Sequence, residues 1–202
     1  MPEVHLPRLG HGPGGSSLLK IVLEVILIGG GVFLGLAGEQ WRENAHNREL
    51  AEMSLRRFRT EMQANRKAVA AVKDYHAVTL KALNAYFAAN ANARKALSVN
   101  IEGLLPAFFD HTAWDLALAT QSLAYIDEEL AFGLSRIYNA QNMYSGLTSG
   151  ITQAMYLRTP TESEDGFMAA VQVYFSDLAG MEPKLLELYD ELIPRLDRAL
   201  DE

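Results

Sequence analysis

Cysteine is absent from the sequence. Disulfide bonds, thiolate metal sites and cysteine nucleophiles are therefore excluded. The absence of cysteine does not determine the cellular compartment, because proteins on both sides of a bacterial membrane can lack this residue. The P-loop motif and the G-x-S-x-G and H-E-x-x-H motifs are also absent. With no recognisable motif, we assign no catalytic residue and expect no cofactor; an enzyme without a known motif remains the residual alternative.

Charge is unevenly distributed along the chain. Residues 39–95 hold 11 Lys and Arg against 6 Asp and Glu, which gives +5, whereas residues 96–202 hold 5 against 17, which gives −12. A basic first helix packed against acidic later helices accounts for this pattern, because the two parts attract each other. The positive charge is modest and interleaved with acidic residues, so nucleic acid is not an expected partner.

The first apolar run predicts a membrane-spanning helix. Residues 1–17 are rich in Gly, Pro and Ser and predict a flexible tail. Residues 18–38 are almost wholly apolar, and at about 1.5 Å per residue a helix of that length spans the hydrocarbon core of a bilayer. Lys20 is expected at one membrane interface, and Trp41 with Arg42 at the other.

Polar and small residues within this run suggest helix association. Glu24 lies about one helical turn inside the apolar run, where Lys20 can pair with it. The Glu24 side chain either tilts toward the headgroups or contacts another membrane helix. Gly31 and Gly35 form a G-x-x-x-G motif, which lets two helices approach closely. A cleaved signal peptide is the alternative, because Gly35 and Ala37 are small residues suitably placed before Gly38.

The rest of the chain, residues 39–202, predicts one helical bundle domain. No glycine or proline occurs from residue 39 to 102, which favours a long amphipathic helix continuing from the membrane helix. Its apolar row is Leu55, Phe58, Met62, Val69, Val72, His76, Leu80, Leu83 and Phe87. Asn65 also lies in that row, where it either sets register or pairing or is partly exposed.

Helix caps and breaks divide the remaining sequence. Asp110 or Thr112 is expected to cap a short helix, and Asp127 a long one. Pro183 and Pro194 are expected to kink or divide the last helical segment, which begins at Ser163. No segment alternates with the period of a strand. The sequence therefore predicts an all-α fold, a bundle of three long helices and one short one.

Two parts of the sequence look familiar. These are E24-V-I-L-I-G-G-G-V-F-L-G-L, followed by W41-R-E-N and E61-M-Q-A-N65, and a later part with T112-A-W114-D115, S122-L-A-Y-I-D-E-E-L130 and I137-Y138. Together they resemble an uncharacterised family of bacterial single-pass membrane proteins, a domain of unknown function. The resemblance implies an architecture, and it implies a domain on the periplasmic side of the inner membrane. Counting Lys and Arg on the two sides of the apolar run leans instead toward a cytoplasmic domain.

Histidines and aromatic residues are the remaining candidates for a site. Glu43 and His46 match half of a di-iron motif, but the second half is missing, so no metal site is assigned. His76 lies on an apolar row, where a hydrogen-bonded core residue is the simpler interpretation. The aromatic residues of the second half form a possible partner or ligand patch, with core packing as the alternative: Trp114, Tyr125, Phe132 and Tyr138, beside Phe108 and Phe109.

Taken together, the sequence favours a membrane-anchored interaction protein of the bacterial envelope, either a scaffold or an accessory subunit. The expected partners are membrane lipid and either a second copy of the chain or another envelope membrane protein. A single-pass sensor that binds a small ligand is the alternative, motivated by the aromatic residues.

Overall fold

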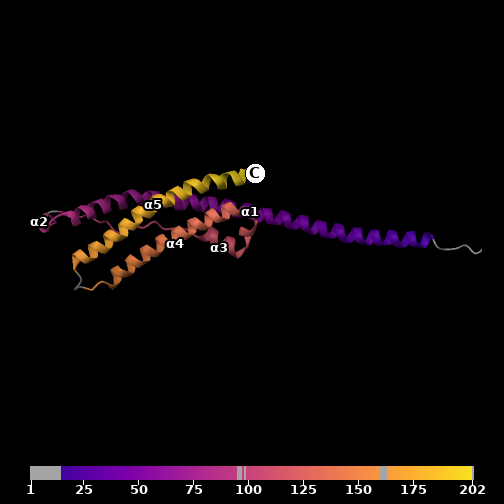
Figure 1. Cartoon of the computed structure of the whole chain (residues 1–202), viewed down its shortest axis with the longest axis horizontal. Coiled ribbons are helices and arrows are strands. Elements are labelled where there is room, and N and C mark those ends of the chain that lie inside the picture. The colour runs from indigo at the N-terminus through magenta and orange to yellow at the C-terminus, as the bar shows by residue number, and fades with distance from the viewer. Residues whose placement is uncertain (1–14, 95–96, 98, 160–162, 202) are drawn as a thin grey trace, which may run out of the picture. The chain divides into compact units, whose positions relative to one another are not determined.

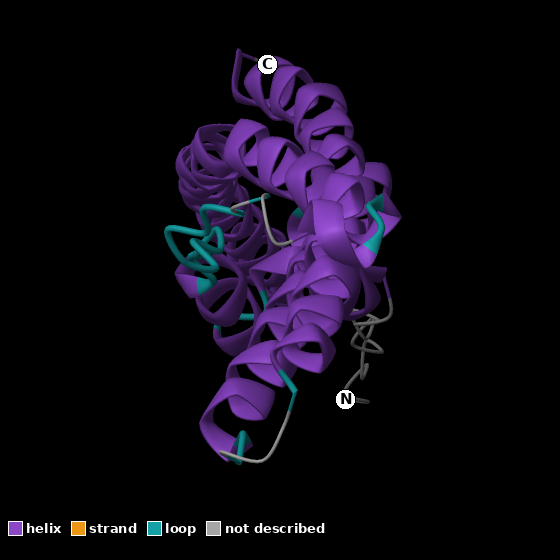
Figure 2. Ribbon diagram, turned by 90° about the vertical axis from the view of Figure 1, so that its left-hand side faces the viewer, coloured by secondary structure: helices purple, strands orange, loops and turns teal. Residues whose placement is uncertain are grey.

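Every regular element of the described residues is helical. The structure is a computed structural model of the chain, and it describes residues 15–94, 97, 99–159 and 163–201. The elements are α1 (Gly15–Ala88), α2 (Ala91–Arg94), α3 (Thr112–Ala119), the 3₁₀ turn η1 (Ser122–Tyr125), α4 (Glu128–Leu157) and α5 (Glu164–Asp201), as Figures 1 and 2 show. The predicted all-α class is confirmed.

The chain separates into two compact units, Met1–Asn47 and Arg48–Glu202. In the first unit, α1 begins at Gly15, so the last three residues of the predicted tail are helical. Residues 1–14 of that tail lie outside the described residues. In the second unit, α1 ends at Ala88, earlier than the absence of Gly and Pro suggested, because the Asn90 side chain accepts a hydrogen bond from Ala93 N at 2.9 Å and starts α2.

Helices α1 and α5 run antiparallel within the second unit. Successive positions forward along α1 pair with successive positions back along α5, through Arg59–Asp197, Arg66–Asp190, His76–Glu182 and Asn84–Gln172. Two of these pairs join an α1 arginine to an α5 aspartate, with 2.6 Å between Arg66 Nε and Asp190 Oδ1. The expected attraction between the basic first helix and an acidic later helix is therefore confirmed here.

Helix α5 also packs antiparallel to α4. The two approach closely at Gly133, where an added Cβ would lie 2.8 Å from Leu192 Cδ1. Pro183 and Pro194 lie inside α5, and the helix runs through both, so the expectation that they divide it is wrong. Both prolines are exposed, which lets water satisfy the carbonyls that lose an N–H partner, while buried Leu185 and Leu192 hold the helix in place.

The segment between α2 and α3 carries the chain back along α1. We call residues 99–111 the strap. The strap runs in the direction opposite to α1. Tyr75 Oη donates to Gly103 O at 2.7 Å, whereas Asp110, later in the strap, pairs with Asn65, which lies earlier in α1. This return lets α4 lie beside α1 near Phe58 and Glu61 and run parallel to it within the second unit, which the sequence did not indicate.

The caps of α3 and α4 follow different rules. Asp127 caps α4 as predicted, with its carboxylate accepting from Leu130 N at 3.0 Å. Neither Asp110 nor Thr112 caps α3; that prediction is wrong, because His111 occupies the cap position without a side-chain bond. A carboxylate from another helix, Glu61 of α1, instead accepts from Ala113 N at 2.8 Å.

The core lies where the faces of α1, α4 and α5 meet. The predicted α1 row is buried at Leu55, Phe58, Met62, Val69, His76 and Leu83, and half-buried at Val72, Leu80 and Phe87. Facing it are fully buried residues of the other two helices: Leu134, Ile137, Tyr144, Phe175, Leu178, Leu185 and Leu196. The amphipathic pattern is confirmed.

Candidate functional site

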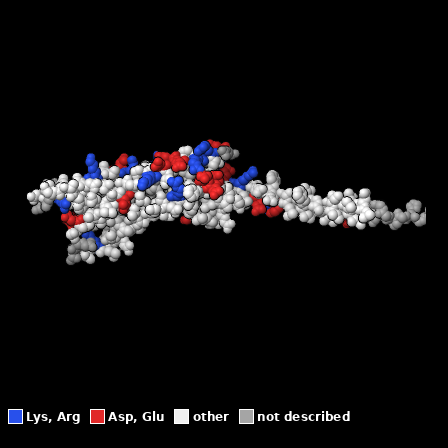
Figure 3. All heavy atoms as spheres, viewed as in Figure 1, with Lys and Arg blue, Asp and Glu red and all other residues white. Residues whose placement is uncertain are grey.

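The apolar part of α1 has no protein covering within its unit. Its large apolar residues from Leu18 to Leu36 are 54–74% exposed, and none of the 18-residue window with mean hydropathy 2.2 is buried. This is the one helix among the described residues that is long and apolar enough to cross a membrane. Figure 3 shows this helix almost free of charged atoms, in contrast to the second unit.

The predicted interface residues lie in α1, near the two ends of its apolar part. Lys20, Glu24, Trp41 and Arg42 are all exposed. Arg42 pairs with Glu39 at 2.7 Å. Among the ion pairs of the described residues, the expected Lys20–Glu24 pair does not occur.

Gly31 and Gly35, two of the three predicted association residues, lie with Gly38 on a side of α1 that has little side-chain bulk. No atom lies within 4 Å of a Cβ added at Gly31, Gly35 or Gly38. At about 100° per residue, Gly35 and Gly38 lie within about 40° of Gly31 around the helix, whereas Gly29 lies about 160° away. The glycine face is therefore Gly31, Gly35 and Gly38; Gly29 is on the opposite side.

The predicted aromatic patch is split by the fold. Trp114 and Tyr138 pack together, with 4.7 Å between ring centroids, and both contact Phe58 of α1. Tyr125 and Phe132 are instead 45% and 63% exposed. The structure thus buries Tyr138 in the core and packs half-buried Trp114 against it. It leaves the other two on the surface, with no ring contact between them in the described part of the chain.

A row of buried polar residues on α1 fixes the returning chain, and sequence reasoning identified only part of it. Ser54 Oγ donates to Ser122 Oγ at 2.7 Å. Asn65 is 1% exposed and makes two bonds to the Asp110 backbone, donating to its carbonyl and accepting from its N–H, each at 2.9 Å. Asn65 is thus a pairing residue within the chain rather than a partly exposed one.

Glu61, between Ser54 and Asn65 on α1, also belongs to this row. One carboxylate oxygen accepts from Ala113 N, and the other from Tyr138 Oη. The negative charge lies at the N-terminus of α3, where the helix dipole favours it. Burial, and then the hydrogen bond to Glu61, raise the pKa of Tyr138, so this phenol keeps its proton. A charged residue in an apolar row is the signal that would have identified this contact from sequence.

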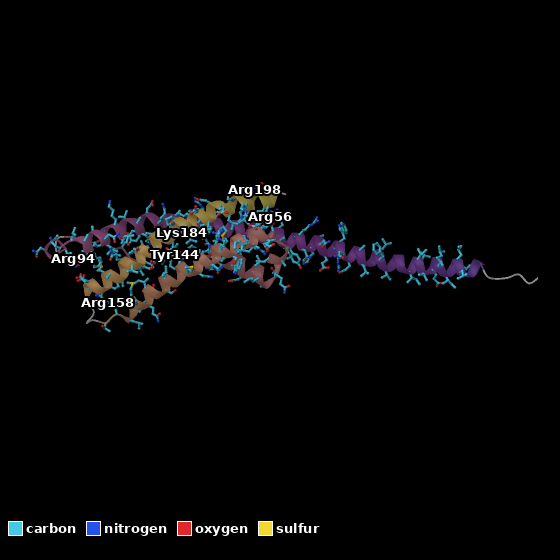
Figure 4. The ribbon with its side chains drawn as sticks, in the orientation of Figure 1. Arg56, Arg94, Tyr144, Arg158, Lys184 and Arg198 are labelled. Carbon is cyan, nitrogen blue, oxygen red and sulfur yellow. The ribbon has the colours of Figure 1, made fainter. Side chains whose placement is uncertain are left out.

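The fourth member, His76, joins a buried network with α4, α5 and the strap. Its Nδ1 lies 2.6 Å from Glu182 Oε1, and its Nε2 lies 3.0 and 3.1 Å from the carbonyl oxygens of Leu104 and Leu105. Tyr144 Oη donates to Glu182 Oε1 at 3.0 Å and accepts from Ala107 N at 3.1 Å. Figure 4 labels Tyr144 on α4 in the interior of the bundle. The interpretation of His76 as a hydrogen-bonded core residue is confirmed.

Surface features of the second unit offer less specific chemistry. A groove of about 660 Å³ between α1 and α3 is lined by Arg56 and Arg57 and also by Glu61 and Asp110, so neither sign of charge dominates. A groove of about 550 Å³ between α4 and α5 is lined by small and apolar residues, among them Gly146, Gly150 and Ala154. Among the described residues, no group of three or more His, Asp or Glu side chains could hold a metal ion.

Comparison with protein-family models, with curated proteins and with solved structures gives no match. The resemblance to a family of bacterial membrane proteins therefore gains no support.

Proposed function

We propose that this chain is a membrane-anchored helical interaction protein of the bacterial envelope, with α1 crossing the inner membrane and the bundle on the periplasmic side. The observation that carries the proposal is the exposure of the apolar part of α1. Thirteen large apolar side chains from Leu18 to Leu36 are more than half exposed. Covering each one is worth roughly 1.5–3 kcal/mol, so on the order of 20 kcal/mol favours a lipid or protein environment for this helix.

The glycine face supports association of two such helices. Lipid tails are as apolar as leucine, so helices in a membrane associate by close packing of small residues rather than by hydrophobic burial. Gly31, Gly35 and Gly38 supply that surface, and their Cα atoms are unobstructed. A second copy of the chain presents the same face, which suits a two-fold arrangement.

The association test compares two double variants. Gly31→Leu/Gly35→Leu fills the glycine face, and Gly29→Leu/Gly30→Leu adds the same two leucines elsewhere on the helix. The native chain lacks cysteine, so one cysteine introduced at exposed Asp201 gives a single labelling site. Energy transfer between labelled chains in bilayers should show association at least tenfold weaker for the first variant and nearly unchanged for the second. Equal association of both variants would remove the glycine face from the proposal, and a monomeric parent chain would remove self-association.

The side of the membrane is tested separately. An alkaline phosphatase fused at the C-terminus folds actively only outside the cytoplasm, whereas a cytoplasmic fluorescent reporter behaves in the opposite way. The proposal expects phosphatase activity. Activity of the cytoplasmic reporter alone would place the bundle inside the cell, as the Lys and Arg count along the sequence suggests.

A further inference from the structure

The surroundings of His76 require more protons than a neutral histidine carries. Both His76 and Glu182 are fully buried. The Nε2 atom faces two carbonyl oxygens, of Leu104 and Leu105, and a carbonyl only accepts, so Nε2 must hold a hydrogen. On the other side of the ring, Nδ1 faces Glu182 Oε1 at 2.6 Å, and this contact needs one further proton, held by either atom.

Loss of that proton forces a choice. A neutral imidazole has one N–H, and an ionised carboxylate only accepts. If the hydrogen stays on Nε2, a lone pair on Nδ1 faces a buried carboxylate. If it moves to Nδ1, a lone pair on Nε2 faces the two strap carbonyls. Only the protonated pair satisfies both contacts, and it also carries no net charge in the core.

The strap at this point is held in a conformation that it does not favour by itself. Leu105 has φ of 42° and Gly103 has φ of 147°. A left-handed leucine costs on the order of 1–2 kcal/mol. The hydrogen bonds from Tyr75 and His76 to the carbonyls of residues 103–105 hold this stretch against α1, so loss of the His76 bond leaves the strain less opposed.

We propose that the His76–Glu182 pair is a proton-dependent clamp: with its shared proton it ties the strap and α5 to α1, and without that proton it releases the strap. The clamp is closed at low pH and opens as pH rises. This proposal is independent of the membrane anchor and concerns the second unit alone.

Other groups around the pair do not supply the missing proton. Glu182 Oε1 also accepts from Tyr144 of α4, and Glu182 Oε2 has no hydrogen-bond partner among the described residues. Tyr174, also on α5, lies close enough to Glu182 for the charge of the carboxylate to raise the pKa of this tyrosine. On α1, the ring of Tyr75 meets that of His76 edge to face, with 5.5 Å between ring centroids, and its hydroxyl donates to Gly103 O. Burial raises the pKa of both Tyr144 and Tyr174, so these phenols keep their own protons.

The test follows strap opening by hydrogen exchange of the full chain in detergent micelles between pH 5 and 10. Peptides that cover residues 99–111 report on the amides of Ala107 and Asp110, which bond to Tyr144 and Asn65. Rates are corrected for the chemical pH dependence of exchange, and peptides from the centre of α4 serve as the internal reference. The clamp predicts a fall in strap protection of at least tenfold through a one-proton transition, with no matching fall in α4.

Three variants locate the proton. Glu182→Gln should abolish the transition and keep the strap protected at high pH, because an amide N–H can donate to Nδ1 while the hydrogen on Nε2 still bonds to the strap carbonyls. His76→Gln should lower strap protection at every pH and abolish the transition. His46→Gln, at an exposed site in the first unit, should leave the profile unchanged.

Strap protection in the parent chain that is independent of pH would overturn the clamp, and so would a transition that persists in His76→Gln. If His76→Gln does not fold, the parent profile and Glu182→Gln decide. A transition in the same place with glutamine at position 182 would show that the shared proton is not responsible.

Discussion

Replacing Asn65 with alanine removes the two hydrogen bonds that tie the strap to the middle of α1. Both bonds are 2.9 Å long and join the side-chain amide to the N–H and C=O of Asp110. Asn65 is 1% exposed, so water replaces the lost partner poorly. Each lost bond costs roughly 0.5–1.5 kcal/mol, with more for any backbone group left unpaired, and we expect a loss of about 2–4 kcal/mol in the free energy of unfolding.

The matched control is Asn84→Ala. Asn84 also sits on α1 and also bonds to a distant residue, with its Oδ1 accepting from Gln172 Nε2 at 2.7 Å, but the contact is exposed. Its loss is expected to cost about 0.5 kcal/mol or less. Because the residue type and the helix are the same, the difference between the two variants isolates burial and pairing with the strap.

Thermal unfolding of the full chain in detergent, followed by circular dichroism, measures the two variants. For a unit of this size, 1 kcal/mol shifts Tm by about 2–4 °C, so Asn65→Ala should lower Tm by roughly 5–15 °C. Oligomeric mass should not change, because the bond partner lies in the same chain. Equal Tm values for the two variants would refute the reasoning, and a change in oligomeric mass with unchanged Tm would make Asn65 an intermolecular contact.

Three further predictions concern caps, strain and buried phenols. Asp127→Ala should cost about 1 kcal/mol in urea unfolding, because Leu130 N loses its acceptor; an unchanged midpoint would contradict this. Gln121 is exposed and has φ of 55°, so Gln121→Gly should raise stability by about 0.5 kcal/mol, whereas a fall would show that the side chain matters more than the strain. Burial raises the pKa of Tyr138, Tyr144 and Tyr189 in the folded chain. Their protonated forms therefore stabilise the fold below the unfolded tyrosine pKa of about 10, and that contribution is lost as pH rises above it. Ultraviolet titration should show that these phenols ionise only when the chain unfolds. Early and reversible ionisation of all tyrosines would contradict the burial.

Periodicity was enough to predict the helices, because burial of an apolar stripe decides helix position. The row from Leu55 to Phe87 on α1 identified the buried face, and Asp127 identified the start of α4 from a local hydrogen bond. Pro183 and Pro194 misled because sequence alone does not say that they face water, where the lost backbone bonds are satisfied.

The polar contacts were largely out of reach, because they join residues far apart in the chain. Glu61 caps α3 from 52 residues away, so a search for local caps selected Asp110 and Thr112 instead. His76 was recognisable as a core residue, but its partner Glu182 is 106 residues away. The register that brings them together depends on the strap, which has no periodic signal. Tyr125 and Phe132 show the same limit, because aromatic composition does not tell packing from exposure.

Membrane partition of the full chain tests the central claim most directly. Membranes from expressing cells are washed with alkaline carbonate, which strips peripheral proteins, and the pellet and supernatant are probed with a C-terminal tag. The exposed apolar segment Leu18–Leu36 of α1 predicts that the intact chain stays in the pellet until detergent is added. Release of the chain into the carbonate supernatant would contradict a membrane-spanning anchor, and recovery of a shortened soluble chain would assign the segment to a cleaved signal peptide.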